Sequence, residues 1–345
     1  MFKISIVTNS LGGGGAEHSM NLLTNELADR GYSVTLVPIN NGVKELVPIR
    51  GQIISLNRER ESSVIQTLKI LFEFKRKINS LHSDFVVLNC DLPELFGLFL
   101  SRRMNLIVVE HANPAWSTRQ KLGRIVRILH FMKNSTFVAV SDHLRVWPTT
   151  RLPKAVTHNI LPKVEGSIVE TSSQEQVSRL VYIGRLAKVQ KRPHWLIEIS
   201  RRTKLPVLFV GAGEEEENLI QEAKSSGINA EFSGHQVDPW ATISKGDLVV
   251  VPSLFEGDGL VAVEAIAKGI PLLLSDIRDF RRFELGEISY ASSLDAFVNR
   301  ILENKHSIYS LRVSKTDRER ILKDRDPVLV GDTWAKIFED LRGLN

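Results

Sequence analysis

The fold of this chain is decided by the stretch Leu254-Phe255-Glu256-Gly257-Asp258-Gly259-Leu260-Val261-Ala262-Val263-Glu264-Ala265. Directly before it, residues 247–253 form a β-branched run that ends at Pro-Ser, which predicts a short buried strand. A glycine-rich turn follows the first glutamate, and an apolar run of helical character leads to the second. Such a turn lets backbone N–H groups approach a ligand, and a helix N-terminus favours an anion. The carboxylates on either side suit sugar hydroxyls, and the alternative is an ordinary strand–loop–helix with solvated glutamates.

Units of strand and helix recur along the whole chain. In the first half we expect strands at residues 2–8, 32–39, 85–88, 106–109 and 137–140. The pattern then restarts, with strands at residues 180–183, 207–210, 228–232, 248–251 and 271–275. Helices are expected at residues 16–30, 64–81, 193–201 and 214–225. Repeated units of this kind predict an α/β protein with parallel sheets covered by helices.

The break between the two patterns is polar and aperiodic, as expected of a linker. It spans residues 162–177 and divides the 345 residues into an N-terminal domain, 1–163, and a C-terminal domain, 177–327. A final helix is expected in 328–345, with one apolar face made by Trp334, Ile337, Phe338 and Leu341. Two such domains predict a cleft between them, and ligands of these sheets bind beyond the carboxyl ends of the strands.

Composition describes a water-soluble globular protein, with 43% apolar and 25% charged residues. Its single cysteine, Cys90, excludes a disulfide framework and a cysteine-built metal site, and we interpret it as a small buried hydrophobe on a strand. No apolar run approaches the ~18 residues of a membrane-spanning helix. The apolar N-terminal run is too short for a signal peptide. These features predict a cytoplasmic protein.

Charge is divided unevenly between the two halves. Residues 1–163 hold 21 Lys and Arg against 12 Asp and Glu, whereas the remainder holds 24 against 28. A basic half indicates an anionic partner, either nucleic acid or an anionic membrane leaflet. Because no nucleic-acid-binding motif accompanies the charge, we favour the membrane and expect no nucleic-acid partner.

Two cations follow the first strand of the second half. Arg185 directly follows the Tyr-Ile-Gly end of that strand, and Lys191 precedes the next helix. A diphosphate carries negative charge on both phosphates, and the charge on the outer one grows when it acts as a leaving group. Two cations can stabilise that charge without a metal. The alternative is a pair of solvated surface cations.

The first half offers two weaker signals. Residues 12–15 are four glycines between a strand and a helix, without the spacing of a dinucleotide site and without the Lys-Ser/Thr of a phosphate loop. They form either a tight turn or a ligand loop. His111 follows a buried strand, and a lone histidine of this kind is either structural or catalytic. A third candidate, Asp324-Arg325-Asp326, has the form of an Asp-x-Asp metal motif but lies beside a proline outside any strand end, so we reject it as a metal site.

Together these motifs resemble the retaining glycosyltransferases with a GT-B fold, of the glycosyltransferase family 4 (group 1) type. The paired glutamates match the motif of that family, and residues 267–272 match the helix end and strand that follow it. The resemblance implies two Rossmann-like domains that face each other across a cleft, with the last helix crossing back onto the first domain. It also implies metal-independent transfer of a hexose or N-acetylhexosamine from a nucleotide sugar, expected to be a UDP-sugar, to a glycan acceptor. A lipid-linked acceptor would place the chain in bacterial surface polysaccharide or lipopolysaccharide synthesis.

The resemblance also assigns residues. Arg185 and Lys191 match the phosphate-binding pair, Glu256 and His111 are expected to contact the donor sugar, and Glu264 the ribose. The catalytic candidates are Arg185, Lys191, Glu256 and His111. The donor-binding candidates are Gly14, Gly15, Gly184, Gly213, His235, Gly257, Asp258, Gly259, Leu260, Val261 and Glu264.

This chain departs from the family pattern at three places. Ala16-Glu17-His18 stands where the family often has an arginine after the glycines, so only a backbone contact is expected from that loop. Arg192 replaces the usual glycine. Asp258 replaces a common aromatic residue, and it is either a further contact to a donor hydroxyl or a solvated turn residue.

Other functions use the same architecture. A nucleotide-sugar epimerase would need carboxylates at the sugar, which the paired glutamates could supply. A non-catalytic nucleotide-sugar binder is a third possibility, but it would not need both the cation pair and the glutamate pair. The sequence argues against an oxidoreductase, because no strand–turn has the dinucleotide glycine spacing.

Two basic helices in the first half predict attachment to the inner face of an anionic membrane. One carries Lys69, Lys75, Arg76 and Lys77. The other carries Arg119, Lys121, Arg124 and Arg127 beside Trp116, with Leu122, Ile125, Val126 and Leu129 interleaved. Such a pattern suits a helix that lies on a membrane. The alternative is a pair of packed helices with solvated outer faces.

Overall fold

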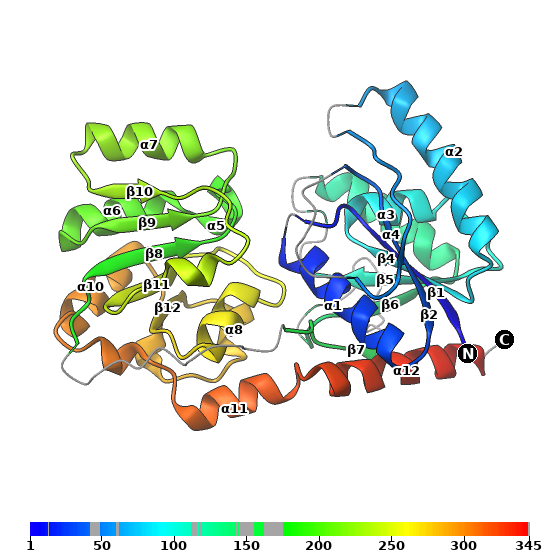
Figure 1. Cartoon of the computed structure of the whole chain (residues 1–345). Helices are drawn as coiled ribbons and strands as arrows, with labels where there is room; N and C mark the ends of the chain where they lie inside the picture. The colour runs from blue at the N-terminus through cyan, green and yellow to red at the C-terminus, as the bar shows by residue number, and fades with distance from the viewer. Residues whose placement is uncertain are drawn as a thin grey trace. The chain divides into compact units, whose positions relative to one another are not determined.

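The computed structural model describes residues 1–12, 14–41, 49–59, 62–111, 116, 119–142, 144, 155–161 and 175–343. The chain forms two compact units, one made of Met1–Pro162 with Asp324–Asn345 and the other of Lys163–Lys323 (Figure 1). Each unit holds one sheet of parallel strands flanked by helices, so the predicted α/β class is confirmed. Most of the predicted linker, residues 162–174, lies outside the described residues.

The first unit has a seven-stranded sheet in the order β3-β2-β1-β4-β5-β6-β7. Its strands are β1 (Lys3–Thr8), β2 (Ser33–Pro38), β3 (Gln52–Ile53), β4 (Phe85–Asn89), β5 (Asn105–Glu110), β6 (Thr136–Ala139) and β7 (Ala155–Val156). The chain moves outward in one direction from β1 and in the other from β4. The boundary between these two strands is therefore a topological switch point, beside which ligands of such sheets bind.

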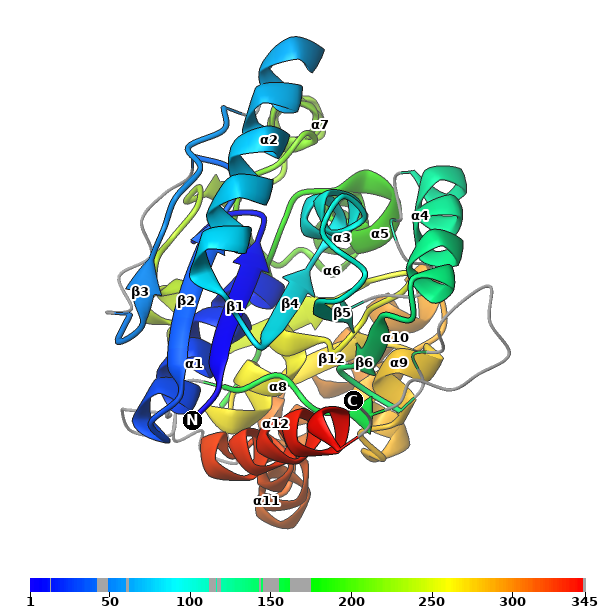
Figure 2. The same cartoon turned by 90° about the vertical axis from the view of Figure 1, so that its right-hand side faces the viewer.

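Helices cover both faces of this sheet (Figures 1 and 2). They are α1 (Gly15–Asp29), α2 (Val64–Leu81), α3 (Asp91–Gly97), α4 (Gln120–Met132) and α12 (Pro327–Arg342). Helices α2 and α3 pack on one face through Phe74, Ile78 and Phe96, and α4 lies beside α3. The central strands are buried on both faces, which explains their nearly continuous Val, Ile and Leu sequences.

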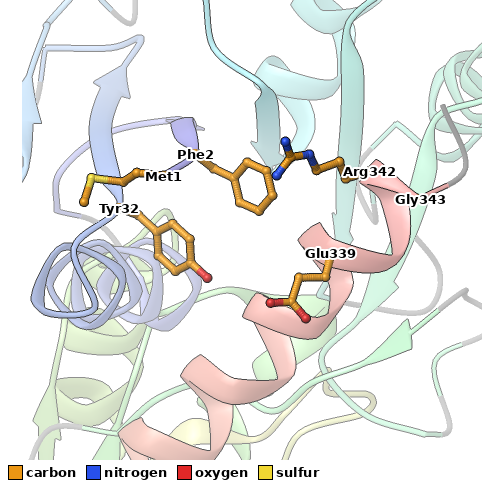
Figure 3. Close-up of a pocket in the computed structure, with 6 residues that line it drawn as sticks. All are labelled: Met1, Phe2, Tyr32, Glu339, Arg342 and Gly343. Atoms are coloured by element: carbon orange, nitrogen blue, oxygen red, sulfur yellow. The ribbon is translucent and has the colours of Figure 1, made fainter.

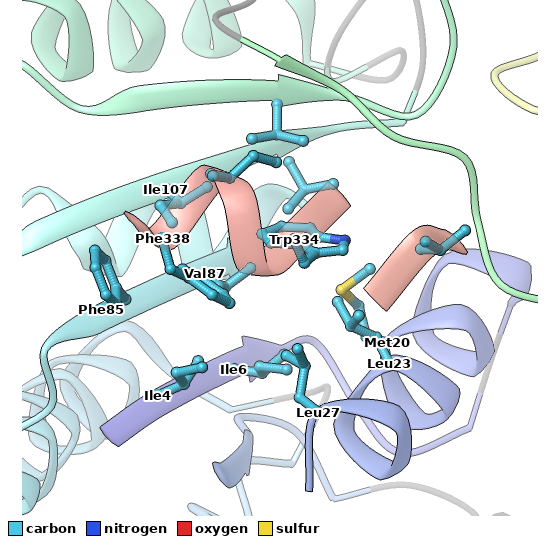
Figure 4. Packing of buried hydrophobic residues seen from close by; sticks show 14 of the residues in the cluster. Ile4, Ile6, Met20, Leu23, Leu27, Phe85, Val87, Ile107, Trp334 and Phe338 are labelled. Carbon is cyan, nitrogen blue, oxygen red and sulfur yellow. The ribbon is translucent and has the colours of Figure 1, made fainter. Parts of the chain in front are cut away.

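The last helix belongs to the first unit. Asp326 caps α12 by accepting hydrogen bonds from the backbone N–H groups of Val328 and Leu329, and Pro327 occupies the first turn. Trp334 and Phe338 are buried against β1, β4 and α1 (Figure 4). The ring centroids of Phe338 and Phe85 are 4.8 Å apart. Burial of two large aromatic side chains holds the helix in place. The prediction that the last helix returns to the first domain is confirmed.

The second unit has a six-stranded sheet in the order β10-β9-β8-β11-β12-β13. Its strands are β8 (Arg179–Ile183), β9 (Val207–Val210), β10 (Ala230–Phe232), β11 (Asp247–Val251), β12 (Leu272–Ser275) and β13 (Tyr290–Ala291). Its α-helices are α5 (Lys188–Lys191), α6 (His194–Thr203), α7 (Glu216–Ser225), α8 (Leu260–Ala267), α9 (Arg278–Arg281), α10 (Leu294–Asn304) and α11 (Lys315–Lys323). Here the switch point lies between β8 and β11.

Several short elements were not predicted. The two-residue strands β3, β7 and β13 are too short to show an alternating pattern, and α3 and α9 span about two turns or less. The prediction for Cys90 was wrong in part, since the residue follows β4 as the cap of α3 and is half-buried. Burial raises the pKa of its thiol, so the residue is not a reactive thiolate. Among the described helices, none has the length and apolar character needed to cross a membrane.

Candidate functional site

The loops that follow β8, β9 and β10 pack against one another through glycines. The Gly184 N–H donates to Val210 O at 2.9 Å, and the Gly211 N–H donates to Gly234 O at 2.8 Å. A Cβ atom on Gly211 would lie 2.0 Å from Gly184 O, and one on Gly213 would lie 2.5 Å from Leu186 O. Only glycine permits this approach. The glycines therefore shape the carboxyl edge of the sheet, and donor binding by Gly184 and Gly213 stays a prediction.

Arg185 and Lys191 lie at this edge, as the sequence predicts. The backbone oxygen of Arg185 accepts a hydrogen bond from the Tyr182 hydroxyl at 2.7 Å, which holds the turn after β8. Burial raises the pKa of that hydroxyl, so it remains a donor. The exposed guanidinium of Arg185 donates to Gln190 Oε1 at 3.1 Å. One turn of helix, α5, then carries Lys191 back toward the end of β11.

Glu256 joins these residues across the switch point. Its Oε1 atom lies 2.6 Å from Lys191 Nζ and accepts a hydrogen bond from Ser253 Oγ, also at 2.6 Å. The backbone N–H of Glu256 donates to Asp279 Oδ2 at 2.6 Å. The Leu254 N–H donates to Gln190 O at 2.8 Å, which ties the loops after β8 and β11 together. The structure thus places three of the four catalytic candidates in one cluster.

Glu264 lies on the same helix that the glycine turn introduces. Gly259 begins α8 with a φ of +60°, and a Cβ atom there would meet the Phe280 ring at 2.8 Å. Leu260, Val261 and Glu264 make the partly exposed side of this helix, because residues three and four apart share a face. Glu264 Oε2 accepts a hydrogen bond from Trp240 Nε1 at 2.7 Å.

Two predicted donor contacts have different surroundings. His235 is exposed after β10. Asp258 is buried, and its Oδ1 atom accepts a hydrogen bond from Arg282 Nη2 at 2.5 Å, so the alternative of a solvated turn residue is wrong. Arg282 also donates to the backbone oxygen of Asp258 at 2.6 Å. This arginine fixes the turn that contains Gly257, and contact between Asp258 and a donor hydroxyl stays a prediction.

Sequence reasoning missed the residues that hold this cluster. Trp240, Asp279 and Arg282 each lie more than 20 residues from their partners and carry no motif. Only the sheet topology brings them to the site. A buried or aromatic residue near a strand end is too common a signal to have identified them.

In the first unit, the glycine turn leads into α1. Gly14 is the N-terminal cap of this helix and has an extended backbone, with φ at −174°, and Gly15 begins the helix. Both are exposed. Asn21 Nδ2 donates to Leu11 O at 2.9 Å and holds the loop. The first N–H groups of a helix have no intrahelical partner, which makes this turn suitable for an anion.

His111 lies at the carboxyl end of β5 in the same unit. Its Nε2 atom is 2.5 Å from Oδ1 of Asn89, the last residue of β4. The preceding residue, Glu110, is buried and forms an ion pair with Arg127. The edge that carries His111 is therefore held from two sides.

Helix α4 turns one of its basic residues, Arg127, inward. Arg127 is 2% exposed, and its Nη2 atom lies 2.9 Å from Glu94 Oε1. Trp116 donates its indole N–H to Glu94 Oε2 at 2.9 Å. Burial raises the pKa of the Glu94 carboxyl, although Arg127 and Trp116 oppose the shift. The prediction that Arg127, Val126 and Trp116 face a membrane was wrong, because all three are buried.

In the described part of the chain, neither metal ligation nor pocket geometry adds a residue to the candidate site. Within the described ranges no cluster of three His, Cys, Asp or Glu side chains could hold a metal ion. A pocket of about 570 Å³ lies at the amino end of β1, the opposite edge from the glycine turn (Figure 3). Its lining is Met1, Phe2, Tyr32, Glu339, Arg342 and Gly343. None of these is a predicted site residue.

Comparisons with known proteins agree with the fold. Residues 166–284 match the family described as glycosyl transferases group 1. That range includes Arg185, Lys191, Glu256 and Glu264. This part of the chain is similar to group 1 glycosyl transferases, and the chain as a whole has a GT-B fold. The predicted family resemblance and the two Rossmann-like sheets are confirmed, whereas retention of configuration and membership of family 4 stay predictions.

Two relatives of the chain are distant in sequence but match most of its length. One is the GalNAc-α-(1→4)-GalNAc-α-(1→3)-diNAcBac-PP-undecaprenol α-1,4-N-acetyl-D-galactosaminyltransferase of Campylobacter jejuni, 22% identical over 77% of each chain. Another is the amylovoran biosynthesis glycosyltransferase AmsD of Erwinia amylovora, 24% identical over 81% of this chain and 82% of the relative. The solved structure of Anabaena Alr3699/HepE in complex with UDP and glucose superposes with a TM-score of 0.79 at 17% identity. It covers 99% of this chain and 100% of its own.

Proposed function

We propose that this protein transfers a hexose or N-acetylhexosamine from a UDP-sugar to a lipid-linked glycan, with retention of anomeric configuration and without a metal ion. The observation that carries the proposal is the cluster of Arg185, Lys191 and Glu256 at the switch point between β8 and β11. Two cations and a carboxylate at a strand-end ligand site suit a sugar diphosphate. Glycosyltransferase relatives support the same reaction class.

Each member of the cluster has a distinct chemical task. Arg185 and Lys191 stabilise the charge that grows on the diphosphate as the glycosidic bond breaks. Glu256 accepts a hydrogen bond from a sugar hydroxyl, and Ser253 and Lys191 hold that carboxylate in place. Glu264 accepts hydrogen bonds from the ribose, and Trp240 orients it. The start of α8 adds a partial positive charge.

The first unit supplies the remaining contacts in this proposal. His111 bonds the donor sugar, and the backbone of Gly14 and Gly15 faces the phosphates. These roles rest on the family resemblance and are supported by the position of each residue at the carboxyl edge of its sheet.

A donor screen tests the reaction class. Thermal unfolding of the protein is measured with UDP-, GDP- and ADP-sugars, and a bound donor raises the melting temperature. The stabilising donor is then incubated with and without a lipid-linked glycan. We expect sugar transfer only with the acceptor, a product with the donor configuration, and activity that survives a chelator. Conversion of the donor to its epimer without any acceptor would instead identify an epimerase, and stabilisation without turnover would identify a binder.

Attachment to the inner face of a membrane is the second part of the proposal, and the outer face of α4 supports it. This face is apolar although the inner face carries Arg127 and His130, the reverse of an ordinary surface helix. Ile125 is 56% and Met132 62% exposed. The other exposed apolar residues of this helix are Leu122, Ile128, Leu129 and Phe131.

Basic residues border this apolar face. Arg119, Lys121 and Arg124 are exposed at the start of α4, as the sequence predicts. Helix α2 repeats the arrangement, with Val64, Ile65, Leu68 and Phe72 exposed among Lys69, Lys75 and Arg76. Apolar side chains beside cations suit the headgroup region of an anionic bilayer. The Campylobacter jejuni relative is named for a PP-undecaprenol-linked glycan, which agrees with an acceptor held in such a bilayer.

A further inference from the structure

We propose that Asn89 is a positioning residue that fixes the ring of His111 with its proton on Nε2. The inference rests on the proposed function for one step only, the contact between His111 and the donor sugar. No sequence motif marks Asn89, which ends β4 and is fully buried. Its two neighbours in the sheet are β1 and β5, whose carboxyl ends carry the glycine turn and His111.

The hydrogen bonds of Asn89 fix the orientation of its amide. Nδ2 lies 3.5 Å from Ala16 O and 3.2 Å from Thr8 Oγ1. A backbone carbonyl oxygen can only accept a hydrogen bond, so the amide nitrogen must face Ala16. Rotation of the amide by 180° would set two oxygens against each other. The amide oxygen of Asn89 therefore faces His111.

The orientation of the amide then determines the state of the histidine ring. Asn89 Oδ1 is 2.5 Å from His111 Nε2 and can only accept, so Nε2 must carry a hydrogen. In the neutral ring the lone pair is then on Nδ1. In this tautomer Nδ1 of His111 can only accept a hydrogen bond, whereas in the opposite tautomer it could only donate one. Asn89 thus selects which partner His111 can bind.

The same amide links the histidine to the glycine turn. Ala16 lies in the first turn of α1, directly after Gly14 and Gly15. Its carbonyl oxygen and the His111 ring bind opposite ends of one amide group. The position of the ring is therefore set by the same strand end that holds the start of α1.

Nitrogen NMR of the histidine rings in the full-length protein tests the tautomer directly. His130 is an internal reference, because its Nε2 atom lies 2.8 Å from Glu94 O and must also carry the hydrogen. Burial lowers the pKa of His130 to about 4, so its ring is neutral at pH 7. The His111 signals are assigned with the His111→Ala variant. We expect His111 in its neutral form to show the same pattern as His130. A neutral His111 with the proton on Nδ1 would overturn the proposal.

Variants of Asn89 separate positioning from a general structural role. Asn89→Leu removes the acceptor, so the His111 tautomer should no longer be fixed. Asn89→Asp keeps an acceptor, so the His111 ring should keep its proton on Nε2 at alkaline pH, where the ring is neutral. The His130 signals report whether the first unit remains folded in each variant. An unchanged His111 tautomer in Asn89→Leu would contradict the proposal. Even if Asn89→Leu does not fold, the wild-type spectrum and Asn89→Asp still decide it.

A double-mutant cycle connects the tautomer to catalysis. Asn89→Leu should lower kcat/KM for the donor by roughly 10-fold, as expected for loss of one hydrogen bond. If Asn89 acts through His111, adding His111→Ala to Asn89→Leu causes little further loss beyond His111→Ala alone. Independent, multiplying losses would overturn the positioning role. Full activity of His111→Ala would instead contradict the proposed function of His111, and the NMR result would still decide the tautomer.

Discussion

Lys191 Nζ lies 2.6 Å from Glu256 Oε1, so the cation expected at the diphosphate and the carboxylate expected at the sugar form one ion pair. The side chains are 21% and 7% exposed, respectively. Ser253 shares the same carboxylate oxygen. Removal of either charge leaves the other partly buried without its counterion, which is costly in a protein interior. The two predicted functions are therefore coupled before any ligand binds.

Replacement of Lys191 should chiefly affect turnover. Lys191→Met removes charge stabilisation of the leaving diphosphate, and we expect kcat to fall roughly 100-fold or more. Lys188→Met is a matched control, since Lys188 is exposed on the same turn of helix. Steady-state kinetics of the two variants provide the comparison. An equal loss in both, or a strict requirement for Mg²⁺ or Mn²⁺ in the wild type, would show that Lys191 does not have this role.

Glu264 should determine nucleotide affinity. Glu264→Ala removes a charged acceptor from the ribose hydroxyls, and we expect binding to weaken by about 1–3 kcal/mol. Trp240→Phe removes only the indole N–H that orients the carboxylate at 2.7 Å, so its effect should be smaller. Calorimetric titration with the nucleotide measures both. Unchanged affinity in Glu264→Ala would remove this residue from the ribose site.

Asp258 should influence both stability and donor choice. Its carboxylate is 1% exposed and binds Arg282, so Asp258→Asn should destabilise the second unit by up to about 3–5 kcal/mol. Asp258→Asn/Arg282→Met removes both charges and should recover part of that loss. Chemical unfolding measures these changes.

Donor choice is tested separately at the same position. Asp258→Phe restores the aromatic residue common in the family and should change the relative activities with different UDP-sugars. If the ranking stays the same while stability falls, Asp258 acts only on the turn.

The sequence predicted what depends on local order and missed what depends on topology. Apolar runs that predict strands placed Arg185, Glu256 and His111 at strand ends, and parallel strands bring their carboxyl ends to one edge of a sheet. Trp240 and Asn89 were missed, since their partners are 24 and 22 residues away in the chain.

The orientation of α4 shows the same limit for a helix. Its apolar and basic residues alternate around the helix, so periodicity alone could not decide which side would be buried. Buried Glu94 and Glu110 on neighbouring elements draw Arg127 inward, and the apolar residues are then left outside. The buried face of α4 is therefore determined by acidic residues on neighbouring elements, and the sequence of the helix alone does not reveal them.

His130 should make the first unit less stable in mild acid. Its pKa is lowered from 6.5 to about 4, first because of burial, so the folded state keeps the ring neutral. Between these pH values the unfolded state binds a proton that the folded state does not. Stability is therefore lost as the pH falls from 6.5 toward 4, by about 3 kcal/mol in all.

The loss is measured against a variant that cannot titrate. His130→Gln can still donate to Glu94 O and accept from Ser135, whose contacts with the ring are 2.8 and 2.9 Å. Hydrogen exchange of first-unit amides at pH 7 and 4.5 should show a smaller loss in His130→Gln. Glu94 titrates in both proteins and cancels in the comparison. His306→Gln, at an exposed site, should behave like the wild type.

Membrane attachment should depend on the outer face of α4. Ile125→Glu and Met132→Glu place a charge where 56% and 62% of the side chain is exposed, so neither should disturb the core. Both should weaken sedimentation with anionic vesicles, because an apolar contact is lost and a repulsive charge is gained. Lys121→Gln and Arg124→Gln should each weaken binding by about 1 kcal/mol, or roughly fivefold.

The matched control is Tyr309→Glu, which introduces the same charge at a 53% exposed aromatic residue of the second unit. It should bind vesicles as the wild type does. Binding of the wild type should also fall with added salt, since the Debye length shortens from about 10 Å at 0.1 M to 3 Å at 1 M. Equal binding to neutral and anionic vesicles would exclude an electrostatic contribution. If the α4 variants bound as well as Tyr309→Glu, another surface would have to hold the membrane, and the exposed apolar face of α4 would remain available for a protein partner.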